Sequence, residues 1–337
     1  MKNKPMYDRT KESKISNKGV IGIRCVRLIS SIMDHIVMII LILLLVYGTY
    51  SVIDTKQIYT QASYTQYEQY KPISEADTLS FETLQEINNE VFAWLTVYGT
   101  RIDYPVAHNA EDNNKYVNTD ITGKYSLAGS IYLASKNNKN FSDFNSIIYG
   151  HHMNEGAMFG DLDKFKEQDF FQSRRYGNLY FEGKNHGIEF FAYLSADAYD
   201  WNIYNPGLNG SDEEKQAYIV YLLEQATYTR EVDVSIANQI ILLSTCSADQ
   251  TNGRDILVGK LSDEIYSNNF AMESQDDKRQ VSDTQVIKEW VGELTSWGWI
   301  TVLLIIILIL ILLILLESFH NKKKIRGGEK IEKAKKL

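Results

Sequence analysis

The sequence predicts a mainly β domain with helices, folded as a closed or nearly closed barrel of seven or eight strands and flanked by two transmembrane helices. Two observations support this prediction. The chain of 337 residues has two long uncharged apolar segments, one near each end. Between them, short apolar runs of strand length alternate with turn-forming residues, and only two or three stretches have helical spacing. Such a series of short strands is typical of a β-barrel.

Both apolar segments are long enough to cross a membrane. Residues 36–53 and 297–316 carry no charged side chain, and about 20 such residues span a hydrocarbon core. A cleaved signal peptide is the alternative for the first segment, but the run is too long and no small-x-small cleavage site follows it. A sorting signal cleaved before the second segment is the other alternative, but no Leu-Pro-x-Thr-Gly-like stretch precedes Trp297.

The charge distribution sets the orientation of these spans. The whole chain has a net charge of -8, although both ends are rich in Lys and Arg. Because basic flanks stay in the cytoplasm, we expect cytoplasmic tails at residues 1–35 and 317–337, and a two-pass protein of the cell membrane whose residues 54–296 are extracellular. An acidic centre argues against nucleic-acid binding, which concentrates positive charge on the folded domain.

The extracellular part divides into three regions by composition. Residues 54–79 are polar and Tyr-rich, which suggests a stalk, and residues 263–296 are charged and polar, which suggests a tether. The folded domain is expected at residues 80–262. It would begin with a short helix capped by Ser80, with Phe81, Leu84 and Ile87 on one face.

Eight strand-like runs follow within this domain. The predicted strands cover residues 92–97, 102–106, 130–134, 145–149, 178–182, 188–194, 236–243 and 255–261. The fifth and sixth form a hairpin around a five-residue loop at 183–187. Apolar residues recur every three positions from Met158 to Phe165, which favours a short amphipathic helix. Ser211 and Glu214 form a capping box that opens a second helix, ending near Gln225.

The two cysteines, Cys25 and Cys246, fall on opposite sides of the predicted membrane and so cannot pair within the chain. A single thiol outside the cell is a candidate reactive group, although a cysteine after an apolar run is more often a small buried residue. The six histidines are scattered and no Cys/His spacing suits zinc. We therefore expect no metal and no cofactor.

Three strand-like segments each deliver one reactive side chain at or near an end: His151, Cys246 and Arg254. A thiol with a pKa near 8.5 needs a cationic neighbour to ionise at neutral pH, and histidine can hold a proton and release it to a leaving amine. Arginine supplies a permanent charge in a planar fork. From the residues alone these roles stay open, since His152 is a rival and Arg254 could be a solvated surface charge.

A family resemblance favours the catalytic interpretation. The segment Leu242-Leu243-Ser244-Thr245-Cys246 resembles the Thr-Leu-x-Thr-Cys strand end of sortases, the membrane-anchored cysteine transpeptidases of Gram-positive bacteria, with Leu242 in place of the first Thr. Tyr149-Gly150-His151 is similar to the Gly-His of that family, and Arg254 with the following strand to its Arg. The resemblance covers about residues 80–262. Motifs similar to class B members lie at residues 88–94, 99–106, 129–132, 150–153 and 158–160, and in the helical insertion at 211–225.

The resemblance implies the sortase barrel and its chemistry. Cys246 would attack the carbonyl of a Thr in a sorting signal, His151 would protonate the leaving amine, and Arg254 would steady the peptide and the oxyanion. Ser244 and Thr245 would lie beside the bound peptide. The implied partners are secreted proteins with a carboxy-terminal sorting signal, an amine acceptor from a peptidoglycan precursor or a pilin, and membrane lipid.

The second predicted span departs from class B, whose members commonly have only an amino-terminal anchor. Pilus-building class C sortases often carry a carboxy-terminal span, but their lid motif, Asp-Pro-aromatic, is absent from residues 54–90. Two other functions stay open. A membrane-bound cysteine protease would share Cys246 and His151 but release its acyl group to water, and an extracellular sensor or binding domain would keep Cys246 inert.

Overall fold

The computed structural model describes residues 17–72, 79–247 and 251–270. The predicted second transmembrane helix (297–316), both ends of the chain and residues 271–296 of the predicted tether lie outside these residues. Within them, one helix, α1 (Asn17–Ala62), contains a segment from Cys25 to Ala62 that is long and apolar enough to cross a membrane. It includes the predicted span at 36–53.

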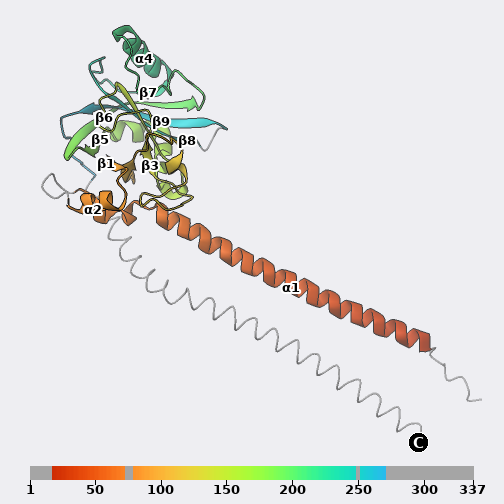
Figure 1. Ribbon diagram of the computed structural model, residues 1–337. Coiled ribbons are helices and arrows are strands. Elements are labelled where there is room, and N and C mark those ends of the chain that lie inside the picture. The colour runs from red at the N-terminus through yellow and green to blue at the C-terminus, as the bar shows by residue number, and fades with distance from the viewer. Residues whose placement is uncertain (1–16, 73–78, 248–250, 271–337) are drawn as a thin grey trace, which may run out of the picture. The chain divides into compact units, whose positions relative to one another are not determined.

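The folded domain is a closed eight-stranded barrel with a ninth strand attached (Figure 1). The barrel order is β5-β1-β2-β3-β4-β8-β9-β6, and β6 pairs again with β5 to close it, while β7 extends the sheet from β6. The pairs β2–β3 and β4–β8 are parallel and the other pairs are antiparallel. The strands are β1 (Val91–Val97), β2 (Asp103–Ala107), β3 (Ile131–Leu133), β4 (Asn145–Tyr149), β5 (Tyr176–Phe181), β6 (Lys184–Asp197), β7 (Ala226–Thr229), β8 (Ile240–Cys246) and β9 (Gly253–Ser262).

The period-two alternation of the strands divides the apolar side chains between the cluster that fills the barrel and clusters outside it. On β8, Ile241 and Leu243 belong to the cluster that fills the barrel, and Ile240 and Leu242 belong to a second cluster outside it. Successive side chains on a strand point to opposite faces, so both faces of β8 are buried. The outer cluster is covered by helix α4 (Asp212–Gln225) through Tyr218, Ile219 and Leu222.

Several sequence predictions are confirmed. All eight predicted strands exist, within a few residues of the expected ends, and α4 begins at the capping box of Ser211 and Glu214. The short strand β7 was missed because its side chains alternate only between half-buried and exposed.

The hairpin prediction was wrong about its loop. Instead of five residues, the turn consists of Glu182 and Gly183, both with positive φ (49° and 78°), and β6 starts at Lys184. Two positive-φ residues match the twist of a tight hairpin. The segment Lys184–Gly187 therefore pairs with β5, despite its polar sequence.

Two helix predictions also need correction. The stretch at Met158–Phe165 forms a 3₁₀ helix, η5 (Gly160–Lys166), which fits an apolar period of three better than an α-helix. It leads into a short α-helix, α3 (Gln168–Ser173). Ser80 does not cap α2 (Leu79–Ile87) but lies inside it, and Ile87 is exposed.

The segment expected to be a stalk packs against the barrel in its middle part. Helix α1 continues to Ala62, which is buried in the barrel cluster, and two 3₁₀ turns follow, η1 (Tyr64–Gln66) and η2 (Glu68–Tyr70). The Tyr104 hydroxyl donates to the Ala62 carbonyl at 2.9 Å. Folded structure therefore begins before residue 80.

A buried carboxylate, Asp143, ties the loop before β4 to the segment before α4. It accepts hydrogen bonds from the side chains of Asn137, Asn138 and Asn209 at 2.6–3.2 Å and from the Asn138 backbone at 2.7 Å. Burial alone would raise the pKa of Asp143, but these donors bring it below its usual value. The ionised form therefore stabilises the fold.

We expect the Asp143→Asn variant to lose about 1.5–3 kcal/mol of unfolding free energy at pH 7, because an amide cannot accept from all these donors. The folded-state pKa lies below the unfolded value of about 3.9. The difference between wild type and variant should therefore be full above about pH 5 and shrink as the pH falls through the folded-state pKa. Denaturant unfolding at several pH values measures it. A difference that grows on acidification would contradict the assignment.

Candidate active site

Cys246 and Arg254 lie directly opposite each other at the ends of two paired strands. Cys246 is the last residue of β8 and Arg254 the second of β9, and they are register partners in the antiparallel pair. Opposed residues in such a pair have Cα atoms about 4.5–5.5 Å apart and side chains on the same face. The thiol is exposed and the guanidinium half-buried, with Nη1 donating to the Gly253 carbonyl at 3.0 Å.

His151 reaches the same place from the other side of β8. Strand β4 runs parallel to β8 with Tyr149 in register with Ser244, and the Gly150 N–H donates to the Ser244 carbonyl at 3.2 Å. His151 lies two residues after Tyr149, and Cys246 lies two residues after Ser244, so the two reactive residues are brought to the same end of the paired strands. A Cβ at Gly150 would lie 2.4 Å from Ile131 and 2.9 Å from Phe159, so the chain needs glycine before His151.

The His151 ring is oriented by a backbone acceptor. Its Nε2 lies 2.8 Å from the Val117 carbonyl oxygen. A carbonyl only accepts, so Nε2 carries the hydrogen, and in the neutral ring Nδ1 is then the proton acceptor. The ring is half-buried. This arrangement holds an imidazole that can take up a proton at Nδ1.

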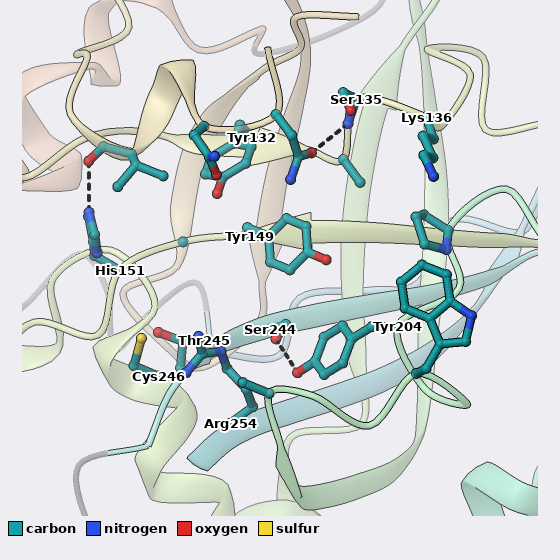
Figure 2. A pocket seen from close by; sticks show the side chains of 18 residues that line it. Tyr132, Ser135, Lys136, Tyr149, His151, Tyr204, Ser244, Thr245, Cys246 and Arg254 are labelled. Atoms are coloured by element: carbon teal, nitrogen blue, oxygen red, sulfur yellow. Dashed lines mark hydrogen bonds between the residues drawn. The ribbon is translucent and has the colours of Figure 1, made fainter. Parts of the chain in front are cut away.

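A groove of about 530 Å³ runs from these three residues across the outer surface of the barrel. Figure 2 shows His151, Cys246 and Arg254 at one end of it and Lys136 at the other, with Tyr149 and Tyr204 between them. Among the residues that the structure describes, none of those lining the groove carries a carboxylate. The lining residues are Asn113, Asn114, Val117, Tyr132, Ala134, Ser135, Lys136, Tyr149, Gly150, His151, Ala198, Trp201, Tyr204, Pro206, Ser244, Thr245, Cys246 and Arg254.

A row of tyrosines forms the wall of the groove. The Tyr132 and Tyr149 rings lie 5.5 Å apart and the Tyr149 and Tyr204 rings 6.4 Å apart, measured between centroids. Burial raises the pKa of Tyr149 to about 12, although the nearby Arg254 opposes this, and burial also raises the pKa of Tyr132 and Tyr204. All three phenols are therefore neutral at physiological pH.

Ser244 and Thr245 line the groove but are almost fully buried. The Ser244 hydroxyl lies 2.9 Å from the Tyr204 hydroxyl, and Thr245 Oγ1 has no hydrogen-bond partner among the described residues. The structure thus brings all five candidate residues of the sequence analysis to one groove. Their roles remain proposals.

Sequence reasoning missed most of the groove wall. Tyr149 lies in the motif that identified His151, but nothing in the pattern distinguished its ring from a core aromatic. Trp201 and Tyr204 come from the irregular segment between β6 and α4, for which no element was predicted. As for metals, the described residues contain no group of three or more His, Cys, Asp or Glu side chains that could hold an ion.

Comparison with known proteins decides the family. A family model described as "Sortase domain" matches residues 95–262. Sortase B of Listeria monocytogenes is 34% identical over 180 residues, which cover 53% of this chain and 72% of the relative. The chain belongs to the sortase family. Sortases are cysteine transpeptidases, so an exposed thiol at the end of a groove agrees with the family.

The similar solved structures are class B sortases, as the sequence resemblance predicted. Sortase B of Clostridium perfringens is 31% identical with a TM-score of 0.51, over 54% of this chain and 98% of that chain. A Streptococcus pyogenes class B sortase involved in pilus biogenesis is 34% identical with a TM-score of 0.50, over 54% and 97%. The sortase domain of this chain therefore has a barrel similar to those of class B sortases, and it carries helix α4 between β6 and β8.

Proposed function

We propose that this sortase is anchored in the cell membrane and transfers secreted proteins from a sorting signal to an amine. The observation that carries the proposal is the convergence of His151, Cys246 and Arg254 at one end of the groove, from three neighbouring strands of a sortase barrel. Helix α1 supplies the anchor. A substrate held in the same membrane by its own tail would meet the groove at a high effective concentration.

The proposed reaction has two halves. The Cys246 thiol gives its proton to His151, and the resulting sulfur anion attacks the carbonyl carbon of a threonine in the sorting signal. Arg254 stabilises the tetrahedral oxyanion with its fixed positive charge. As the intermediate collapses, the C–N bond breaks and His151 returns the proton to the leaving amine. A thioester between the substrate and Cys246 remains.

The second half reverses these roles. A free amine attacks the thioester carbon and gives its proton to His151, and the C–S bond breaks to form a new amide. The leaving sulfur takes that proton back from His151. The acceptor class is a peptidoglycan precursor amine or a pilin lysine, and the similarity to a Streptococcus pyogenes sortase involved in pilus biogenesis favours the pilin lysine. We further propose that a second span leaves both termini cytoplasmic and the barrel outside.

A peptide library tests this function. The full chain in detergent is incubated with pentapeptides, with and without triglycine, and the products are analysed by mass spectrometry. A thioester on Cys246 and an amide to triglycine are expected. Hydrolysis alone in the presence of triglycine would instead identify a cysteine protease. Absence of any acyl-enzyme, together with slow thiol labelling that does not respond to His151→Ala, would favour a binding domain.

A further inference from the structure

Behind the groove, four charged or ionisable side chains form a network that the proposed reaction does not use. His152 contacts the Asp163 carboxylate through Nε2, and Lys166 Nζ lies 2.9 Å from Asp163 Oδ1. The same Nζ lies 3.2 Å from Asp255 Oδ2, and the Tyr193 hydroxyl donates to Asp255 Oδ1 at 2.9 Å. We call His152, Asp163, Lys166 and Asp255 the bracket network.

The bracket network lies on the reverse side of the strand ends that carry the reactive residues. Thr245 and Asp255 are register partners, one position before Cys246 and one after Arg254. Strand alternation points this pair into the barrel, as it does Leu243 and Leu257 of the barrel cluster. Cys246 and Arg254 therefore face the groove, and Asp255, with a fully buried side chain, lies behind them.

Helix η5 joins two segments that are distant in the sequence: the loop after β4, which carries His151, and the start of β9, which carries Arg254. His152 directly follows His151, and its contact with Asp163 ties that loop to η5. Lys166, the last residue of η5, ties η5 to Asp255 and hence to the β9 strand end that carries Arg254. The loop itself folds back tightly, because the Phe159 N–H donates to the His151 carbonyl at 2.9 Å and a Cβ at Gly160 would lie 2.0 Å from the Met153 oxygen.

We infer that His152, Asp163, Lys166 and Asp255 are positioning residues, which hold His151 and Arg254 in a fixed relation across Cys246. This inference rests on the proposed function. The contacts of His152 with Asp163 and of Lys166 with Asp255 lie along one side-chain path between the two segments, which the backbone pairing of β4, β8 and β9 also joins. Breaking either contact interrupts this side-chain path. Burial and the side-chain hydrogen bond with Asp163 raise the pKa of Asp255, and Lys166 opposes this rise.

A double-mutant cycle tests this side-chain path. His152→Phe breaks the first contact and Lys166→Met the second, and transfer is measured with the best donor pentapeptide of the library and triglycine. Each single variant should lower kcat about tenfold or more with KM within about twofold, because a small misplacement of reacting groups acts on the chemical step. The kcat of the double variant should lie no more than about threefold below the kcat of the less active single variant. Losses that multiply in the double variant would overturn the inference.

A matched control separates positioning from general stability. Glu189, on β6, is like Asp255 a largely buried carboxylate. It is paired with Arg175 at 2.7 Å and with Lys260 at 3.5 Å. Glu189 of β6 is the register partner of Lys260, and Ser195 of β6 is the register partner of Asp255. Ser195 is six residues further along β6 than Glu189, so Glu189 and Asp255 are about 20 Å apart along the strand. Glu189→Gln should lower the thermal midpoint but leave kcat within about twofold. An equal kcat loss in Glu189→Gln would overturn the inference.

Lys166→Met removes the cation that pairs with Asp163 and Asp255, so this variant could lose activity because it misfolds. A second variant separates misfolding from loss of positioning. Lys166→Met combined with Asp255→Asn removes both members of that ion pair and leaves no unpaired buried charge there. It should regain thermal stability but keep the kcat loss, and recovery of kcat along with stability would contradict positioning. If the wild type itself forms no transfer product, the proposed function fails. If the wild type transfers and the network variants match it, only the positioning inference fails.

Discussion

The Cys246→Ala variant is expected to lose transfer activity completely, by more than about 10³-fold, because no other group in the groove can form the thioester. The Cys246 side chain is exposed, so its removal should change the unfolding free energy by no more than about 0.5 kcal/mol. The measurement is the yield of peptide–triglycine product per mole of folded protein, with the thermal midpoint as the check on folding.

The chain contains a matched control for this variant. Cys25 is the other cysteine, also exposed, on helix α1. Cys25→Ala should leave the rate of transfer unchanged. More than about 1% residual transfer in Cys246→Ala would rule out Cys246 as the nucleophile. If Cys25→Ala lost as much transfer as Cys246→Ala, the loss in Cys246→Ala could not be assigned to a nucleophile in the groove.

The Arg254→Lys variant should lose about 10²- to 10³-fold in kcat/KM. The loss of one oxyanion donor has this magnitude in acyl transfer, and an ammonium on a flexible stem cannot copy the planar fork of a guanidinium. Arg254 is half-buried and its guanidinium is steadied by the Gly253 carbonyl, so the geometry of the donors is fixed before substrate binds. Steady-state transfer kinetics measure the loss.

Arg175 provides the comparison, since it lies directly before β5 and forms an ion pair with Glu189 of β6 but is not among the residues that line the groove. Arg175→Lys should keep kcat/KM within about twofold. Near-normal turnover in Arg254→Lys would mean that a positive charge alone is enough at this position, and the proposed stabilisation of the oxyanion by Arg254 would be wrong.

The strands of the barrel were readable from the sequence because both of their faces are buried. Ile240–Leu243 and Ile256–Val258 are continuous apolar runs for this reason, and each ends near a polar residue at the groove. The register between these strands could not be predicted from the sequence. That Cys246 opposes Arg254 follows from strand pairing between residues that are separated by a polar loop, which no local pattern specifies.

The errors have local physical causes. Glu182 is not a typical turn residue, so the two-residue hairpin was read as a longer loop. Apolar spacing of three from Met158 to Phe165 predicts a short amphipathic helix, and the helix that forms is the 3₁₀ helix η5, which has three residues per turn. The tyrosine wall could not be recognised, because Tyr132, Tyr149 and Tyr204 come from three separate segments and only the fold brings their rings together.

The docking of α1 against the barrel has a practical consequence for truncation. Ala62 is part of the barrel cluster, and Ile58, Tyr64 and Tyr67 pack against it. The Tyr104 hydroxyl, which donates to the Ala62 carbonyl, also accepts from the Met158 N–H in the loop after His151. A water-soluble fragment that starts at residue 80 would therefore open an apolar cavity and release a hydrogen bond close to the groove. An expression boundary just upstream of Ile58 keeps that core intact while omitting the predicted membrane span at residues 36–53.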